Sequence, residues 1–357
     1  MNTVAVLPIG VAFGMLVRSS GVYSPTTIRG QMIFHYNIMM KMFMGGMCGS
    51  ALAFVVLQRL YPERFDNVRE TKGFGDKGAL AAVVGGMIQG VGMTLSGSCP
   101  GMIYAQLGAG STTAPIVMLG GVAGAATYAL LHPYLKPALD SDFARTLEGK
   151  FHSMHLDQVL FGGRYAESVL GLAAVALAVA GGFEYLFPSP EIPGYDLNPV
   201  LAGGLVGSLQ LPLFLVVDSF LGMSSGYSVL SSQALRLLPD NCFCEHTYMR
   251  GFVKSKSVWQ VVFGLGVALG AFLVPQVLPD VPSPTEVPPV QSLLGGFLLV
   301  FGARLVGGCA SGHGLTGLPS LHVVSWLVVP SLFAGAIATG FGMAHFAGSA
   351  NYLLLQT

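Results

Sequence analysis

Nine stretches of the chain are apolar along most of their length, and each is long enough to cross a lipid bilayer or nearly so. A membrane-spanning helix needs roughly 17–25 predominantly apolar residues. Several of the stretches are short and interrupted by glycine. The pattern predicts an all-α polytopic membrane protein with about nine transmembrane helices. They cover residues 3–18, 36–58, 78–96, 114–131, 166–187, 199–217, 257–278, 291–306 and 321–345.

Four further pieces, rich in Gly, Ser and Pro, lie beside these stretches. They are too apolar for free loops and too interrupted for complete spans. Irregular backbone at membrane depth is tolerated only where protein or a water-filled cavity surrounds it. We therefore expect four short re-entrant helices, in residues 19–34, 97–112, 218–235 and 307–320.

The composition fits this prediction and excludes other classes of protein. Hydrophobic residues make up 52% of the 357 residues and charged residues only 10%, whereas soluble domains carry about 25% charged residues. A net charge of zero argues against a nucleic-acid surface. The chain contains no Gly-x4-Gly-Lys-Ser/Thr motif, so direct use of ATP is not expected. The five cysteines do not suggest a disulfide framework, and the apolar N-terminus lacks the basic region of a cleaved signal.

The basic residues predict the orientation in the membrane. Thirteen of the 17 lie in the segments 59–77, 132–165 and 236–256, and segments 188–198 and 279–290 contain none. With nine spans, the three basic loops fall on one face of the membrane. Cytoplasmic loops carry an excess of Lys and Arg, so we expect a cytoplasmic N-terminus and an external C-terminus.

Two glycine-rich segments resemble each other at a constant offset of 210 residues. A central span at 166–187 separates four earlier spans from four later ones. Because this single span lies between the two copies, the second copy has the opposite orientation in the membrane. We expect an hourglass-like inverted repeat, with a first half at 1–145, a connecting loop and central helix at 146–198, and a second half at 199–357. Gly85, Gly86, Gly92, Leu95, Gly97 and Cys99 are matched by Gly295, Gly296, Gly302, Leu305, Gly307 and Cys309. A weaker match pairs Gly10-x3-Gly14 and Ser20-Gly21-Val22-Tyr23 with Gly203-x3-Gly207 and Ser225-Gly226-Tyr227.

Each copy places a cysteine in a break between two helices. A glycine ends one helix, and a second, short helix can begin just after the cysteine. A helix N-terminus suits an anion and lowers the pKa of a thiol. A single cysteine is more often a small packing residue, but a matched pair in a repeat of broken helices favours a midplane binding site. The candidate substrate-binding residues are Cys99, Cys309, Gly97, Ser98, Gly101, Gly307, Gly308 and Ser311.

Arginines near the breaks have two interpretations. Arg304 lies five residues before Cys309 in an apolar helix, where a charge is usually functional or paired; the alternative is snorkelling to the interface. Arg18 and Arg29 flank the first broken segment. They could attract anions, but their place near span ends favours interfacial anchors.

Other polar residues receive structural interpretations. His313 is interpreted as a hydrogen-bonded structural residue and not as a metal ligand with Cys309. Cys242-Phe-Cys244-Glu-His246 is interpreted as an ordinary loop, because structural zinc normally takes four ligands. Cys48 and the methionines of residues 32–47 are interpreted as packing residues. No metal or other cofactor is predicted.

The two cysteine segments, the Gly-x3-Gly first helix and the nine-span layout resemble the YeeE/YedE family of membrane sulfur-compound transporters. The resemblance implies uptake of thiosulfate through an hourglass with a thin central barrier, where thiols pass the ion by S–H···S and S–H···O contacts. It implies that Cys99 and Cys309 are relay cysteines. The family has a third cysteine just after the first helix, whereas this chain has Tyr23 and Ser24 there.

The leading hypothesis is a permease for thiosulfate or a related inorganic sulfur anion, and not an enzyme. The first alternative is a membrane thiol enzyme or sulfur-transfer protein that forms a persulfide on Cys99 or Cys309. The second is a non-sulfur channel with packing cysteines. No base or orienting acid accompanies the cysteines, as nucleophilic catalysis usually requires. The expected partners are the anion, the lipid bilayer of the cell membrane and, as a further candidate, a cytoplasmic sulfur-carrier protein; no nucleic acid is expected.

Overall fold

The structure, a computed structural model, describes residues 3–71, 78–139, 155–160, 162–188, 195, 197–235, 248, 252 and 258–354. The regular elements of these residues are helices, and His155 and His322 form one isolated antiparallel bridge. The first part of the chain contains η1 (Thr3–Val6), α1 (Leu7–Ser19), α2 (Pro25–Met32), α3 (Ile38–Leu60), α4 (Pro62–Thr71), α5 (Ala79–Ser96), α6 (Met102–Gly108) and α7 (Ala114–Leu139). The central part contains α9 (Leu156–Leu160) and α10 (Tyr165–Leu186). The last part contains α11 (Pro199–Ser208), α12 (Gln210–Val217), α13 (Ser224–Leu235), α15 (Val258–Val277), α16 (Pro289–Leu305), η2 (Ser311–Gly317), α17 (Val323–Ala347) and α18 (Ser349–Tyr352).

The apolar stretches form the long helices, as predicted for a polytopic α-helical membrane protein. Seven helical segments in the described residues are long and apolar enough to cross a membrane: α3, α5, most of α7, α10, α11 with α12, α15 and α17. The first and eighth stretches form shorter apolar helices, Thr3–Ser19 and Pro289–Leu305. The 17 residues of α16 extend about 26 Å at 1.5 Å per residue, somewhat less than a hydrocarbon core of about 30 Å.

Each of the four broken pieces contains a short helix. These helices are α2, α6, α13 and η2, and η2 is a π-helix of seven residues. Short π-helical segments are rare and occur frequently at functional sites. That the four pieces re-enter the membrane from one face stays a prediction.

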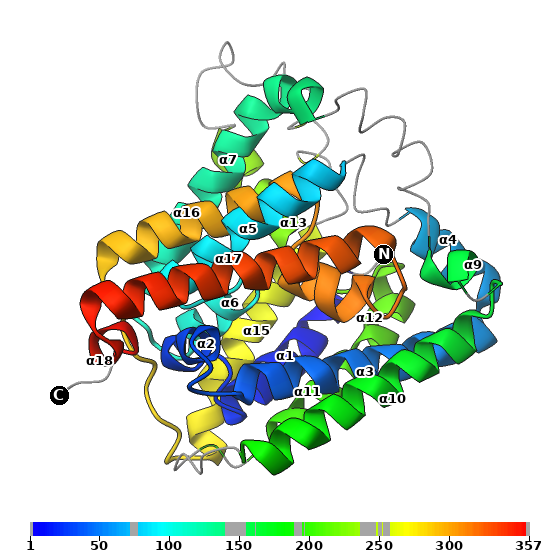
Figure 1. Ribbon diagram of the computed structural model, residues 1–357, viewed down its shortest axis with the longest axis horizontal. Helices are drawn as coiled ribbons and strands as arrows, with labels where there is room; N and C mark the ends of the chain where they lie inside the picture. Colours follow the sequence, from blue (N-terminus) through cyan, green and yellow to red (C-terminus); the bar gives the residue numbers. More distant parts are fainter. Residues whose placement is uncertain are drawn as a thin grey trace.

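The helices of the two halves pack in matched pairs. Helix α1 packs on α15, and its counterpart α11 packs on α3; likewise α5 packs on α17, and α16 packs on α7. Helices α5 and α16 also pack on each other, and this contact joins the α5–α17 pair to the α16–α7 pair (Figure 1). Exchanging the two halves therefore maps the contacts between these pairs onto one another and the α5–α16 contact onto itself, and α5 and α16 begin 210 residues apart. The domain limits predicted at residues 145 and 198 stay predictions.

Glycine allows the close approach of α5 and α16. A Cβ atom on Gly92 would lie 2.1 Å from the backbone nitrogen of Leu299, and one on Gly302 would lie 2.5 Å from the backbone nitrogen of Gln89. Gly92 and Gly302 are matched positions of the repeat. Small residues at such contacts let helix backbones approach closely in membranes. The same contact is thus made once by each half.

The weaker sequence match between the halves is wrong in its alignment of the tyrosines. Tyr23 lies two residues before the start of α2, whereas Tyr227 lies inside α13, which begins at Ser224. The stretch 199–217 is divided near Leu209 into α11 and α12. This second helix lengthens the connection to α13, so the two tyrosines occupy different structural positions.

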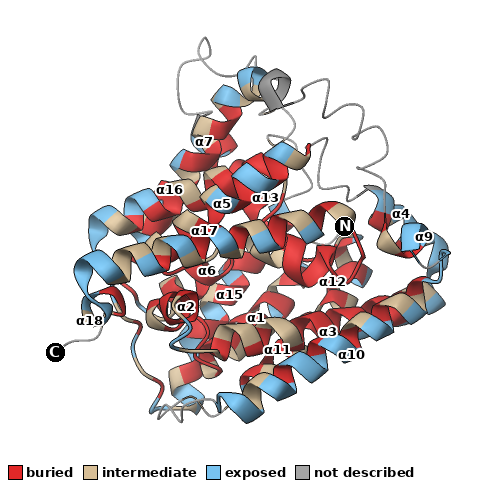
Figure 2. Ribbon diagram, viewed as in Figure 1, coloured by how far each residue is buried: buried red, intermediate tan, exposed pale blue. Residues whose placement is uncertain are grey.

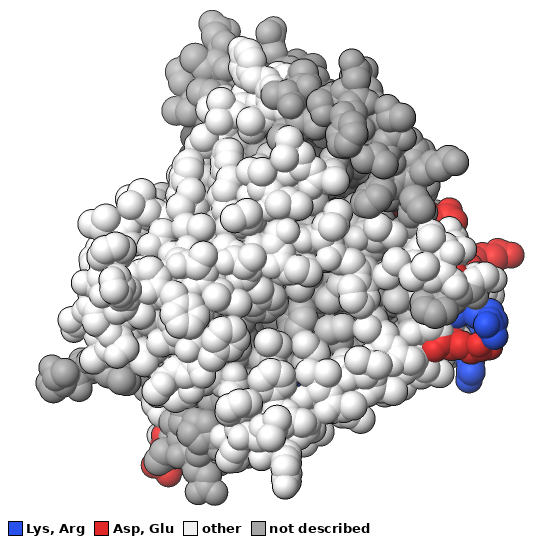
Figure 3. Space-filling model, viewed as in Figure 1, with Lys and Arg blue, Asp and Glu red and all other residues white. Residues whose placement is uncertain are grey.

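Burial and charge agree with a membrane setting. Buried residues line the inward faces of the helices, and exposed residues run along the outer side of α10 (Figure 2). On the face shown in Figure 3, charged side chains gather mainly at the end that contains α4 and α9. Many of the clustered basic residues, such as Arg145 and Lys254, lie outside the described residues. The predicted orientation of the termini therefore stays a prediction.

Candidate functional site

The two cysteine breaks begin with a glycine in the left-handed backbone conformation. Gly97 directly follows α5 with a φ of 57°, and Gly307 follows α16 closely with a φ of 80°. Residues with a Cβ rarely adopt this conformation, and glycine adopts it readily at the ends of helices. Each glycine ends its helix, and the short helix α6 or η2 begins soon after the cysteine, as predicted. The matched sequence positions therefore have matched backbone geometry.

Cys99 lies half-buried at the first break, between α5 and α6. The backbone N–H groups of Gly101 and Met102, at the start of α6, lie near its sulfur. Its neighbour Ser98 is fully buried. The thiol therefore faces backbone donors on one side and, as described below, a cavity on the other.

Cys309 is fully buried at the second break. Its Sγ accepts a hydrogen bond from the backbone N–H of Met223 at 3.4 Å and lies 3.2 Å from Oγ of Ser311. Met223 immediately precedes α13, so the second thiol joins η2 to the start of another short helix. Helices η2 and α13 thus meet at Cys309.

A small cavity of about 100 Å³ lies between the two halves. Cys99, Gly101 and Ser311 line it, together with apolar side chains that include four methionines and three phenylalanines. Cys309 does not line the cavity, but the next two residues, Ala310 and Ser311, do, and its sulfur lies 3.2 Å from Oγ of Ser311. The structure thus brings the two predicted cysteine breaks to one cavity. The thiol of Cys99 and the hydroxyl of Ser311 are the polar side-chain groups of this lining.

The structure places Tyr23 and Ser24 beside this cavity and not in its lining. The Tyr23 hydroxyl donates to the carbonyl oxygen of Pro282 at 2.7 Å, and its ring lies 5.8 Å from the guanidinium of Arg18. Ser24 is buried and precedes the first residue of α2. Val22 lines the cavity in their place.

Arg304 is not brought to the cavity either. Its Nε donates to the Tyr248 hydroxyl at 3.0 Å, and its Nη1 donates to the hydroxyls of Ser224 and Ser225 at 3.2 Å each. Its side chain is buried, so the snorkelling alternative is wrong for this residue. Arg304 joins the C-terminal end of α16 to the first residues of α13.

Arg18 and Arg29 are buried, so their interpretation as interfacial anchors is wrong. Arg29 Nε and Nη2 donate to the carbonyl oxygens of Thr94 and Leu95 at 3.1 and 2.5 Å. These are carbonyls in the last turn of α5, which lack partners within the helix. Arg18 Nη1 donates to the carbonyl oxygen of Ala271 at 2.6 Å. A cation at a helix C-terminus is favourable, so Arg29 stabilises the end of the helix that precedes Cys99.

Two buried polar residues at matched repeat positions were missed by the sequence analysis. Gln106 Nε2, in α6, donates to the carbonyl oxygens of Tyr23 and Gly97 at 2.9 and 3.0 Å. Thr316, in η2 and 210 residues later, donates to the carbonyl oxygen of Leu221 at 2.8 Å. Each side chain binds backbone carbonyls that the broken helices leave free. The signal was available, because polar residues in both short helices share the 210-residue offset.

Tyr227 was also missed. It is fully buried in α13, and its hydroxyl donates to the carbonyl oxygen of Pro100, the residue after Cys99, at 2.8 Å. A helix of the second half therefore positions the break of the first half.

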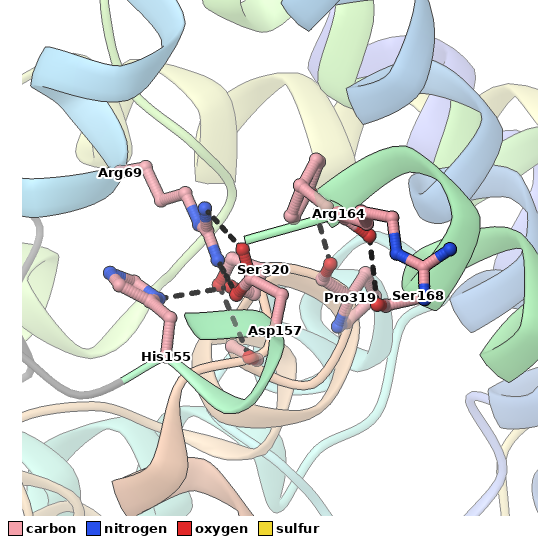
Figure 4. A network of polar contacts seen from close by, with 9 residues as sticks. Arg69, His155, Asp157, Arg164, Ser168, Pro319 and Ser320 are labelled. Atoms are coloured by element: carbon pink, nitrogen blue, oxygen red, sulfur yellow. Dashed lines mark hydrogen bonds and ion pairs between the residues drawn. The ribbon is translucent and has the colours of Figure 1, made fainter. Parts of the chain in front are cut away.

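A polar network fixes the connection between η2 and α17 (Figure 4). Arg69 of α4 pairs with Asp157 of α9 at 2.5 Å, and both side chains are buried. Arg69 Nε also donates to the carbonyl oxygen of Ser320 at 3.0 Å, and Nδ1 of His155 lies 3.2 Å from the same oxygen. Burial and the charge of Arg69 lower the pKa of His155 to about 4. The network joins α4 and α9 to the residues that follow the Cys309 break.

The remaining cysteines lie elsewhere. The Cys48 thiol donates to the carbonyl oxygen of Ala173 at 3.2 Å, between α3 and α10, where it packs as predicted. Cys242 and Cys244 lie outside the described residues. His313 is buried, with Nδ1 3.0 Å from the Ser325 hydroxyl.

Comparison with known proteins agrees with the resemblance seen in the sequence. The chain is similar to the thiosulfate transporter TsuA of Spirochaeta thermophila, with 24% identity over 337 residues, which cover 90% of this chain and 93% of that protein. The family model for sulphur transport matches residues 19–338, a range that includes both cysteine breaks. The chain therefore belongs to the sulphur transport family of membrane proteins, as the resemblance to YeeE/YedE transporters predicted.

Proposed function

We propose that the protein is a permease that carries thiosulfate, or a closely related inorganic sulfur anion, through the cavity between Cys99 and Cys309. Its family transports sulfur compounds, and a similar protein is a thiosulfate transporter. The observation that carries the proposal is that the two cysteine breaks, at matched positions of the two halves, meet at one small cavity. Cys99 lines this cavity, and the sulfur of Cys309 lies 3.2 Å from Oγ of Ser311, which also lines it.

The site offers several weak contacts and no strong one. Thiosulfate is a dianion with one soft terminal sulfur, and a thiol is a soft, weak hydrogen-bond donor. The Ser311 hydroxyl lies 3.2 Å from the Cys309 sulfur and can donate to an oxygen of the anion. The apolar lining gives a dehydrated anion no further polar partner, so tight, prolonged binding in the cavity is unfavourable. Weak binding at successive sites lets an ion leave as well as enter.

Each half contributes one thiol to this path. In the proposed relay, the anion passes from the thiol of one half to the thiol of the other. Gly97, Ser98, Gly101, Gly307 and Gly308 shape the two breaks. The matched packing of the halves and the clustering of basic residues support entry of the two breaks from opposite faces of the membrane. A cytoplasmic sulfur-carrier partner stays a prediction.

Uptake of radiolabelled thiosulfate into proteoliposomes tests the proposal. We expect Cys99→Ala and Cys309→Ala each to abolish or greatly reduce uptake while the protein still inserts. Cys48→Ala is the matched control, because this cysteine packs between α3 and α10 outside the cavity. Full uptake by the Cys99→Ala, Cys309→Ala double variant would show that both residues only pack. Competition by excess sulfite or sulfate identifies the preferred anion.

A further inference from the structure

A long apolar groove lies between α10 and α17, on the outside of the helix bundle. It consists of two depressions of about 500 and 400 Å³ that share Leu172, Val175 and Trp326. The first follows α10 from Arg164 and also includes Leu156 and Leu160 of α9, and the second continues to Phe34. Because the two share three lining residues, they form one continuous groove.

The groove has the dimensions of a lipid chain. Both α10 and α17 are long and apolar enough to span a membrane. Arg164 and Val175 are eleven residues apart, or about 16 Å along a helix. One leaflet of the hydrocarbon core is about 15 Å thick, half of the whole core. The first depression therefore has about the length of one leaflet.

The end of the groove at the start of α10 carries an exposed cation. Arg164, Glu167 and Ser168 line this end beside Leu156 and Leu160, and Gln31 is the polar residue that lines the second depression. Arg164 is 69% exposed and pairs with Glu167 at 3.1 Å. A guanidinium has five N–H donors, so this pairing leaves donors for a phosphate. Arginine recognises phosphate particularly well because of its planar fork of donors.

The groove and the thiol cavity share one wall. Phe43, Val329 and Phe333 line both the second depression and the cavity that contains Cys99. The rings of Phe43 and Phe333 lie edge to face, with centroids 6.0 Å apart. An acyl chain in the groove would contact the outer side of the rings whose inner side lines the thiol cavity.

We propose that this groove binds one phospholipid, with its phosphate at Arg164 and an acyl chain along α10 that packs against the Phe43–Phe333 wall. A phospholipid fits the combination of an exposed guanidinium at one end and an apolar length of about one leaflet. A second copy of the chain is the other class of occupant, and the test below distinguishes it from a lipid. The bound chain supports the aromatic wall from the lipid side.

The two tryptophans of the chain permit a direct test. Trp326 lines the groove, whereas Trp259 is buried on α15. With Trp259→Phe, the remaining fluorescence reports on the groove. The probe is phosphatidylglycerol brominated in mid-chain, titrated into the full-length protein in a non-quenching detergent. We expect quenching to saturate at stoichiometric lipid, because a discrete site fills before random contacts in the micelle accumulate.

Two glycines of α10 supply a matched pair of variants. A Cβ atom on Gly171 or on Gly182 would meet no other atom within 4 Å, and only Gly171 lines the groove. Gly171→Phe should abolish the saturable quenching, and Gly182→Phe should retain it. Quenching that rises linearly with lipid content, or equal quenching in both variants, would overturn the proposal. The proposal would also be overturned if analytical ultracentrifugation showed that the wild-type protein is a dimer and that Gly171→Phe dissociates it. The lipid titration of the Trp259→Phe protein with both glycines intact tests the proposal even if a glycine variant misfolds.

Discussion

Replacing Arg69 with methionine is expected to lower the free energy of unfolding by about 3–5 kcal/mol, the usual cost of removing one partner of a buried ion pair. The structure explains the size of this effect. The Asp157 side chain is only 2% exposed, so its carboxylate would remain buried without its cation. The Ser320 carbonyl would also lose its 3.0 Å hydrogen bond from Arg69. The Arg69 guanidinium lies 4.2 Å from the centre of the Tyr165 ring, and this contact would be lost as well.

A double-mutant cycle separates the pair from its surroundings. Unfolding by SDS in mixed micelles is followed by circular dichroism for Arg69→Met, Asp157→Leu and the combination. Because the double variant buries no unpaired charge, it should recover most of the loss. Arg164→Met is the matched control: its pair with Glu167 is 69% exposed on both sides, so the change should cost less than about 1 kcal/mol. A cost for Arg69→Met as small as that of the control would refute the reasoning, because the pair would then be screened by solvent.

Three further predictions concern this network and the break at Cys99. Stability should fall as the pH falls from 6.5 towards about 4, because His155 becomes protonated in the unfolded chain in this range but stays neutral in the folded protein, where its pKa is lowered. His155→Gln should flatten this part of the profile of stability against pH. An unchanged profile would contradict the assignment. Gly97→Ala should lower the free energy of unfolding by at least about 1–2 kcal/mol, because Gly97 has a left-handed backbone conformation and the added Cβ would lie 2.7 Å from Cβ of Pro25. Gly101→Ala should be nearly neutral in the same unfolding assay, because the nearest atom to its added Cβ would lie 3.6 Å away. Gln106→Leu should destabilise by about 1–3 kcal/mol, because two buried carbonyls lose their donor, and should reduce thiosulfate uptake in proteoliposomes; unchanged stability and uptake would show that water replaces the amide.

The sequence predicted the helices and the breaks because both depend on local physical properties. Length and hydrophobicity determine which segments can span a membrane, so the nine apolar stretches coincide with helices. Glycine is the residue that most readily adopts the left-handed conformation, so Gly97 and Gly307 marked the two helix ends. The 210-residue offset then predicted that Cys99 and Cys309 occupy matched sites, and the structure brings the two breaks to one cavity.

The arginines could not be placed from the sequence. Arg29 binds backbone carbonyls at the end of α5, and Arg304 binds hydroxyls at the start of α13. Backbone carbonyls are present at every position, so no sequence pattern shows which of them a helix break leaves free. The role of Tyr23 was equally hidden, because its hydroxyl binds a carbonyl of Pro282, more than 250 residues away in the chain.

The contact between α5 and α16 also bears on how such a chain can arise. Each helix presents a glycine at the same repeat position to the backbone of the other, which is the self-complementary arrangement of a twofold homodimer interface. A half-length ancestor could have built this interface from two identical subunits before the genes fused. An even number of spans in each half would leave both copies in the same orientation after fusion. Helix α10, which has no counterpart in the matched contacts, is then the added span that the predicted inverted repeat requires.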